Sequence, residues 1–432
     1  MNHMTRDNDG LGRSPVATCE PLMGKTKLSE LITRERVLRS MQGVADWIET
    51  STQADPVEGK CYRMAVYDVA GGVTWMYPNS NTAETISAWL DMGDALGRPE
   101  FTAKAVEYAN ALIENHEYGL YAGPASEAEG LMWYWTDVGS YSTLYSMRIP
   151  RAFMRLYDIT GDQRLLDKCK AIGHTLAREQ LANGLIGGGW SPKKGWEEAN
   201  DRIGSRYAYI LATFANLYKL TSEKSYRQAY ERAVEGVLRM QLDDGSFYQL
   251  YDIETLGVTR AGRSVKCMFF AYIFNALAEA YEIMRDPRLL ECATKLGDYI
   301  VRVYYCYGAL PYCVGPDILP SDLPEMHMST YECANGMLWL YRHVRDERFK
   351  DIGLRLWMSA CLNQADTPDN KALHGAILIG SDPTCSTSIE GIPENRKHLL
   401  YDPRRAAKCV LWGMVNHVFA GKQILESPWL ED

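Results

Sequence analysis

A repeated helix–turn–helix pattern constrains the fold of this chain more than any other sequence feature. Each copy has an apolar helical stretch, a short polar turn and a bulky residue that opens a second helical stretch. The bulky residues are Phe101, Leu165, Tyr226, Leu289 and Phe349, so successive copies are 64, 61, 63 and 60 residues apart. A turn of a few residues makes two helices antiparallel neighbours, so each copy is predicted to be a helical hairpin.

Two further helices complete the predicted architecture. Helical patterns near residues 28–49 and 404–425 extend the five hairpins at either end. If these two helices pair with each other, six hairpins close into a ring. The predicted fold class is therefore all-α, an (α/α)6 barrel or toroid of six helical hairpins. Residues 28–432 are expected to form this single domain, and residues 1–27 a flexible N-terminal arm.

The two helices of a hairpin differ in their predicted burial. Residues 265–281 are apolar on nearly every face, whereas residues 289–303 alternate charged with apolar positions. The first helix of each hairpin is therefore expected to line the ring and the second to cover it. The short turns then lie together at one end, named the turn end, and the long connections at the other, named the loop end. Long loops in a compact domain usually bind or catalyse, so the loop end is predicted to hold the site.

Composition argues against several classes of function. The net charge of −9 is unlike that of a nucleic-acid-binding protein, and no apolar run is long enough to cross a membrane. The first 27 residues lack the apolar core of a secretory signal, and the eleven cysteines include no CxxC pair. These features predict reduced thiols and a cytoplasmic protein. No metal-binding or nucleotide-binding motif is present, so neither a metal nor a cofactor is expected.

Aromatic residues recur in the connections at the loop end. Flat rings that line a groove suit the apolar faces of sugar rings, and the residues assigned to such a groove are Trp75, Tyr77, Trp133, Trp135 and Trp190. The alternative is that these rings pack the loops onto the rim of the barrel.

Basic residues cluster where the inner helices are expected to begin. Arg206, Arg260, Arg263 and Arg404 lie near helix N-termini, whose free N–H groups and positive dipole ends attract anions. They favour a substrate with an acidic group, such as a uronic acid. The alternative is that these arginines pair with neighbouring acids on a solvated rim.

Asp137 is the first candidate for acid–base catalysis. It follows Trp133 and Trp135 and directly precedes a predicted inner helix. Flanking rings would desolvate the carboxyl group and raise its pKa enough for a proton donor. The alternative is an N-cap, because an aspartate at a helix start accepts hydrogen bonds from backbone N–H groups.

Histidines supply a second set of candidates. His327 and Glu325 open the fifth predicted inner helix, where a ring and a carboxylate could serve as a base and its orienting partner. Tyr331 follows one turn later and His374 lies in the last long connection, and both are assigned to substrate binding. Each histidine could instead be an ordinary surface or capping residue.

Parts of the chain resemble a known superfamily. The repeated turn, with Trp-Thr-Asp-Val-Gly at 135–139 and Gly-Ser-Phe-Tyr-Gln-Leu-Tyr-Asp at 245–252, resembles the six-hairpin glycosidases, and among them the unsaturated glucuronyl hydrolases, over roughly residues 80–345. In that family an aspartate that opens an inner helix protonates an enol-ether double bond and then handles the attacking water. The resemblance implies this role for Asp137. The second family carboxylate has no counterpart, because its place is taken by Trp-Met-Tyr-Pro at 75–78.

A second resemblance spans nearly the whole chain. The segments 75–78, 374–383 and 406–409 are similar to those of poorly characterised six-hairpin proteins associated with bacterial glycan handling. This resemblance implies a fold rather than a reaction.

These features together predict a carbohydrate-active enzyme, either a glycoside hydrolase or a polysaccharide lyase. It would hydrolyse or eliminate at a uronate residue of an acidic saccharide, with Asp137 as general acid/base. The expected partner is an anionic small-molecule or oligosaccharide substrate, and neither nucleic acid nor membrane.

Three alternatives stay open. A sugar epimerase could use the same toroid, with His327 and His374 as opposed acid–base groups. A cyclase or isomerase of a hydrophobic metabolite could hold a carbocation among the aromatic rings. A non-catalytic glycan-binding protein would carry no carboxylate with a shifted pKa in its cavity.

Overall fold

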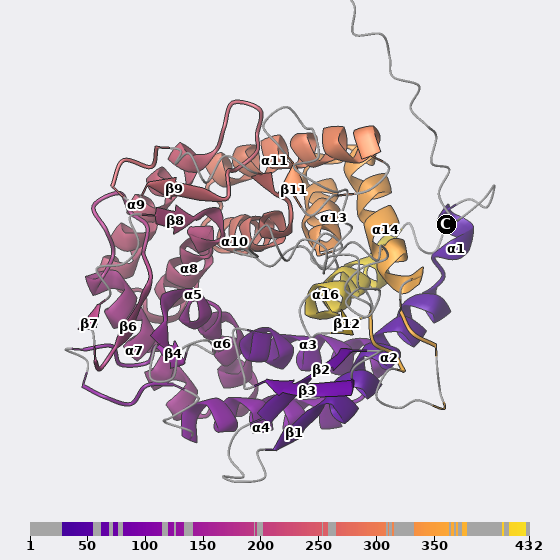
Figure 1. The fold of residues 1–432 in the computed structure, drawn as a ribbon, viewed down its shortest axis with the longest axis horizontal. Coiled ribbons are helices and arrows are strands. Elements are labelled where there is room, and N and C mark those ends of the chain that lie inside the picture. Colours follow the sequence, from indigo (N-terminus) through magenta and orange to yellow (C-terminus); the bar gives the residue numbers. More distant parts are fainter. Residues whose placement is uncertain are drawn as a thin grey trace, which may run out of the picture.

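Long helices form two concentric rings around one axis in the computed structural model (Figure 1). The structure describes residues 28–54, 62–68, 72–76, 81–114, 120–124, 127–133, 141–193, 195–196, 202–252, 254–257, 265–307, 310, 313–314, 332–362, 364–366, 369, 374–377, 408–409 and 414–428. The inner ring consists of α3 (Asn81–Leu96), α6 (Ile149–Thr160), α8 (Ile210–Thr221), α10 (Met268–Met284), α13 (Cys333–Val344) and α16 (Met414–Leu425). The outer ring consists of α2 (Arg34–Ser51), α4 (Glu100–Glu114), α7 (Gln163–Arg178), α9 (Lys224–Met240), α11 (Pro287–Tyr307) and α14 (Glu347–Leu362).

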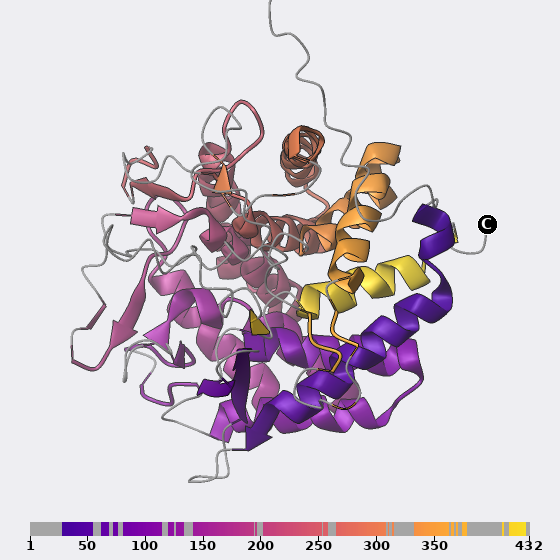
Figure 2. The same cartoon turned by 45° about the vertical axis from the view of Figure 1, so that its right-hand side comes forward.

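The ring is closed. Each inner helix packs against the inner helices on both sides, and α16 packs against α3, so that the last inner helix meets the first. The first outer helix, α2, lies along α16, as Figure 2 shows where the indigo and yellow helices run side by side. The structure thus confirms the predicted (α/α)6 toroid. The extent of the domain, 28–432, stays a prediction, and residues 1–27 lie outside the described part.

The predicted short turns join the inner helices to the outer ones. The residue that follows an inner helix has a left-handed backbone at Gly97, Gly161, Ser222, Arg285 and Arg345, with φ of 66°, 68°, 57°, 54° and 61°. A left-handed residue ends a helix and reverses the chain at once, so the outer helix begins two or three residues later. The large side chains of Trp47, Trp89 and Trp357 fill the space between helices and are fully buried.

The loop end contains short antiparallel strands that the sequence analysis did not predict. One sheet joins β1 (Thr52–Ala54), β2 (Tyr62–Asp68), β3 (Gly72–Met76) and β12 (Lys408–Cys409), and a second joins β4 (Met132–Trp133), β5 (Tyr141–Ser142), β6 (Gly189–Ser191) and β7 (Gly195–Trp196). Two strand pairs are formed by β8 (Arg202–Gly204) with β9 (Leu250–Asp252) and by β10 (Val265–Lys266) with β11 (Cys313–Val314). These pairs tie each long connection to its neighbour.

Two further expectations can be compared with the described helices. The last helix was predicted over 404–425, but α16 begins at Met414, because residues 408–409 form a strand with β2. Within the described part, no helix has the length and apolar character needed to cross a membrane.

The seam that closes the ring contains a buried histidine. His417 on α16 is 3% exposed, stacks on the Trp357 ring at 5.0 Å, and lies with its Nε2 2.8 Å from the Ser40 Oγ of α2. Burial lowers the pKa of this imidazole from 6.5 to about 3. The ring therefore stays neutral in the folded protein under conditions where an unfolded chain would protonate it.

This histidine is expected to destabilise the protein as the pH falls. Below pH 6.5 the unfolded chain takes up a proton that the folded chain resists down to about pH 3, so acid favours unfolding in that window. At about 1.4 kcal/mol per pH unit, the loss reaches about 3 kcal/mol at roughly pH 4. Within this window, the free energy of unfolding in urea should depend less steeply on pH for His417→Gln than for the native chain. His174→Gln, which changes an exposed histidine, serves as control, and equal slopes in all three proteins would contradict the assignment.

Candidate active site

Three charged side chains meet at the loop end of the inner ring. Glu84 lies in the first turn of α3, Arg148 directly precedes α6, and Glu332 directly precedes α13. Because every inner helix starts at this end, residues far apart in sequence reach the same region of the axis. All three are buried, with exposed fractions of 5%, 2% and 2%. Charged residues are seldom buried unless they are paired, so this group needs a specific explanation.

Arg148 holds the centre of this group. Its Nη1 donates to the Glu84 Oε2 at 3.1 Å, and its guanidinium lies over the rings of Tyr272 at 4.3 Å and Tyr209 at 5.6 Å. The ion pair and the two ring faces compensate the charge of Arg148 in an environment without bulk water. Glu84 is therefore the carboxylate partner of a fixed cation.

Glu332 has different surroundings from Glu84. Burial raises the pKa of the Glu332 carboxyl well above its ordinary value, and the negative charge of Glu84 raises it further. Arg148 and a hydrogen bond from the Asn416 Nδ2, 2.9 Å from the Glu332 Oε2, act in the opposite direction. A buried carboxyl group with a raised pKa is the kind of group that acts as a general acid. Glu332 can therefore keep a proton and donate it.

Three of the predicted site residues have described side chains, and each has contacts of its own. Arg206, on the 3-10 helix η1 (Ser205–Tyr209), places its guanidinium 5.2 Å from the centre of the Phe269 ring on α10. Trp190 is 6% exposed and packs against Tyr121 with ring centres 4.8 Å apart. Its ring also lies 6.1 Å from that of Tyr141, so the three rings form one cluster.

His374 lies away from the axis. It directly precedes Gly375, whose backbone lies against Gly43 of the outer helix α2. Its Nδ1 is 3.8 Å from the exposed Asp366 carboxylate. The substrate-binding roles of His374, Arg206 and Trp190 stay predictions.

The other predicted site residues cannot be placed. The backbones of Trp75 and Trp133 belong to β3 and β4, but their side chains are outside the described part. The residues that lie wholly outside it are Asp137, Glu325, His327, Tyr77, Trp135, Arg260, Arg263, Tyr331 and Arg404. Their roles stay predictions.

The sequence analysis did not select Glu84, Arg148 or Glu332. A signal for them was present, because each is a charged residue at the start of a predicted inner helix. Nothing in the local sequence distinguishes such a residue from a helix cap. The three residues come together only when the ring closes, so the local sequence does not reveal the site. Among the described residues, no group of three His, Cys, Asp or Glu side chains is placed to hold a metal ion.

Comparison with known proteins connects this ring to carbohydrate enzymes. Residues 186–376, less than half of the chain, match the model of the beta-L-arabinofuranosidase GH127 catalytic domain. This segment begins just before β6 and ends after α14, and it includes Glu332 but not Asp137. No curated protein matches the sequence of the chain.

Solved structures with the same fold cover most of the chain. An unsaturated glucuronyl hydrolase from Bacillus sp. GL1 has a TM-score of 0.64 at 16% identity, with 91% of this chain and 97% of that one covered. A sugar epimerase from a ruminal bacterium has a TM-score of 0.68 at 11% identity, with 91% and 98% covered. A D-mannose isomerase has a TM-score of 0.67 at 12% identity, with 91% and 98% covered.

At identities this low, similarity to solved structures establishes only the fold. The match to a catalytic domain indicates the class of protein. Together they confirm the prediction of a carbohydrate-active enzyme. The chain has the (α/α)6 toroid of these solved structures.

Proposed function

We propose that the chain is a glycoside hydrolase that works at the loop end of the toroid, with Glu332 as its proton donor. The observation that carries this proposal is the pair of buried carboxyl groups with unlike surroundings, Glu84 paired with Arg148 and Glu332 with a raised pKa. Cleavage of a glycosidic bond needs an acid that protonates the leaving oxygen, and a neutral buried carboxyl group suits this task.

A second carboxylate is needed to support the positive charge that develops at the sugar carbon, or to activate water. Asp137 is the candidate from the sequence, since the resemblance to unsaturated glucuronyl hydrolases assigns it acid/base chemistry. Glu84 is a described carboxylate whose negative charge acts on Glu332 even while it is paired with Arg148.

Two substrate classes are supported by different observations. The basic residues near the inner helix starts, of which Arg206 is described, favour a saccharide with a uronate group. The matched catalytic domain is that of a beta-L-arabinofuranosidase, which favours a terminal L-arabinofuranoside. We place the uronate saccharide first, because cations at the starts of the inner helices attract a carboxylate.

A cytoplasmic location belongs to the same proposal. The described cysteines Cys169, Cys267, Cys292, Cys306, Cys333 and Cys361 are free thiols, as expected in a reducing compartment.

The test is a substrate panel for the full chain. It contains unsaturated and saturated uronate oligosaccharides, an aryl L-arabinofuranoside and an aryl hexoside that is neutral. Loss of the C4–C5 double-bond absorbance would indicate hydrolysis of an unsaturated uronate, and gain of it elimination. Arabinose release would favour the second substrate class. Asp137→Asn should reduce the measured rate at least about a hundredfold if Asp137 is the second carboxylate, and an unchanged rate would remove it from the mechanism.

A further inference from the structure

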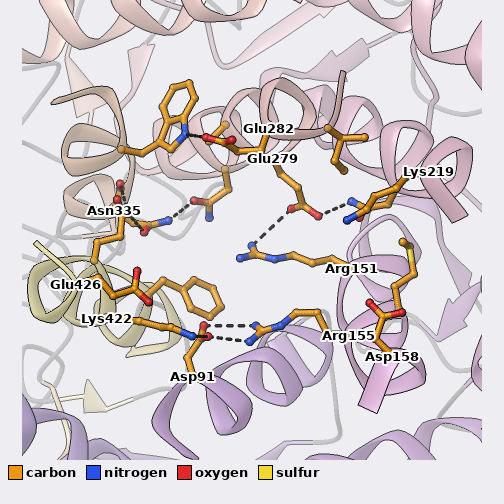
Figure 3. A pocket seen from close by; sticks show the side chains of 18 residues that line it. Asp91, Arg151, Arg155, Asp158, Lys219, Glu279, Glu282, Asn335, Lys422 and Glu426 are labelled. Atoms are coloured by element: carbon orange, nitrogen blue, oxygen red, sulfur yellow. Dashed lines mark hydrogen bonds and ion pairs between the residues drawn. The ribbon is translucent and has the colours of Figure 1, made fainter. Parts of the chain in front are cut away.

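A row of four amide side chains connects the turn end of the ring to Glu332. This amide row consists of Gln423 and Asn416 on α16, Asn335 on α13 and Asn275 on α10. Asn335 and Gln423 belong to the wall of a cavity on the ring axis at the turn end (Figure 3). Asn275 and Asn416 are only 3% and 1% exposed. Bulk water therefore does not compete for the hydrogen bonds that lead to Glu332.

The hydrogen bonds of the amide row all run in one direction. Gln423 Nε2 donates to the Asn335 Oδ1 at 2.5 Å, and Asn335 Nδ2 donates to the Asn275 Oδ1 at 2.9 Å. Asn275 Nδ2 donates to the Asn416 Oδ1 at 2.7 Å, and Asn416 Nδ2 lies 2.9 Å from the Glu332 Oε2. Each oxygen accepts from the amide before it and each nitrogen donates to the group after it. The row therefore ends with a donor that faces Glu332.

This direction is fixed at the turn end. Gln423 Nε2 also donates to the backbone carbonyl oxygen of Asn335, at 2.9 Å. A carbonyl oxygen can only accept, so the Gln423 amide must turn its nitrogen toward Asn335. The Asn335 side-chain oxygen then faces that nitrogen, and the same requirement passes to Asn275 and Asn416. A group far from Glu332 thus decides which atom of Asn416 faces it.

The orientation of Asn416 matters to a proton donor. Because its N–H group donates to the Glu332 Oε2, that oxygen is the acceptor, and the proton of the neutral carboxyl group belongs on Oε1. A reversed Asn416 would present its own oxygen and accept the carboxyl proton. That hydrogen bond would stabilise the neutral form and hold the proton inside the protein.

We propose that the amide row positions Glu332 and keeps its proton free for the leaving oxygen of a glycoside. This inference rests on the proposed function of Glu332 as proton donor. During transfer the bond between Oε1 and its proton breaks, a bond to the leaving oxygen forms, and Glu332 becomes a carboxylate. The N–H group of Asn416 then donates to a charged oxygen, which makes the hydrogen bond stronger. The row therefore stabilises the charge that develops during the reaction more than the neutral acid.

The charged and titratable groups that interact with Glu332 lie outside the amide row. In the described part they are Glu84 on α3, Arg148 before α6, Tyr272 on α10 and the adjacent Cys333. Burial and Glu84 raise the pKa of Glu332, whereas Arg148 and the hydrogen bond from Asn416 lower it. An uncharged variant of the row changes only the last of these contributions.

Two variants of Asn335, made in the full chain, test the proposal. Asn335→Leu cuts the row with a side chain of the same branched shape, so Asn275 and Asn416 are free to reverse together. Asn335→Asp reverses them, because an ionised carboxylate can only accept and Asn275 must then donate to it. Asn416 would in turn donate to Asn275 and present its oxygen to Glu332.

Asn216→Leu is the matched control. Asn216 lines the same cavity from α8, but it donates to Glu279 and is not part of the amide row. Two quantities are measured in each protein. One is the pH profile of kcat/KM on the best substrate of the panel. The other is the titration of the Glu332 carboxyl group, from infrared difference spectra against Glu332→Gln, which needs no turnover.

Both Asn335 variants should lower kcat at least about tenfold. They should also move the basic limb of the profile up by about one to two pH units, the usual effect of one hydrogen bond to a charged group. The infrared titration should move in the same direction, and further in Asn335→Asp than in Asn335→Leu. Asn216→Leu should move neither the limb nor the titration.

The outcomes separate this inference from the proposed function. An active enzyme in which Asn335→Leu moves neither the limb nor the titration would overturn the role of the amide row and leave Glu332 as the donor. A shift in Asn335→Asp alone would reflect its added charge and would also overturn that role. An infrared shift in both variants of a chain that is inactive on the whole panel would show that the row sets the protonation of Glu332, and the proposed function would fail.

Discussion

Glu332→Gln is expected to lower kcat about 10²- to 10⁴-fold, which is the usual contribution of a positioned general acid. Glutamine has nearly the shape of glutamic acid and keeps an oxygen that can accept the hydrogen bond from Asn416. It cannot supply a proton to the leaving oxygen. KM should change little, because the ground-state contacts of the substrate remain. Steady-state kinetics on the best substrate of the panel measure both constants.

The pH profile separates proton donation from a structural role. If Glu332 must be protonated, kcat/KM falls as the pH rises through its raised pKa, and this basic limb disappears in Glu332→Gln. Glu235→Gln, at a side chain 65% exposed on α9, is the control and should leave rate and profile unchanged. A variant that loses activity but keeps the basic limb would show that Glu332 only supports the fold of the site.

The fold could be predicted because its determinants are local and repeated. The turns that end at Phe101, Leu165, Tyr226, Leu289 and Phe349 each have a residue in the left-handed conformation that stops one helix and starts the next. Six hairpins with one apolar face have few ways to bury it other than a ring. Helix ends were less predictable, and the strand at residues 408–409 was assigned to a helix because two residues carry no recognisable period.

The site could be predicted only in part, for a different physical reason. Asp137 was selected from its neighbours in sequence, whereas Glu84 and Glu332 are 248 positions apart and interact only once the ring has closed. The raised pKa of Glu332 comes from burial and from the charge of Glu84, and neither property exists in an open chain. Sequence patterns identify groups that could do chemistry, but the electrostatic environment that selects one of them is a product of the tertiary fold.

Arg148→Met is expected to destabilise the protein by about 3–5 kcal/mol, the usual cost of leaving one member of a buried ion pair without its partner. Arg148 and Glu84 have side chains only 2% and 6% exposed, so water cannot replace the lost guanidinium. Methionine keeps most of the volume between Tyr272 and Tyr209, so the loss should come from charge rather than from a cavity. Urea unfolding gives the free energy, provided that the slope with denaturant does not change.

Two comparisons identify the origin of this loss. Arg148→Met combined with Glu84→Gln should recover a large part of it, because an amide is far less costly to bury than a carboxylate without a cation. Arg164→Met removes an ion pair with Asp162 in which the arginine is 52% exposed, and it should change stability by no more than about 0.5 kcal/mol. If Arg148→Met costs no more than Arg164→Met, or if the double variant is less stable than Arg148→Met alone, then the buried pair does not hold the loop end together as described.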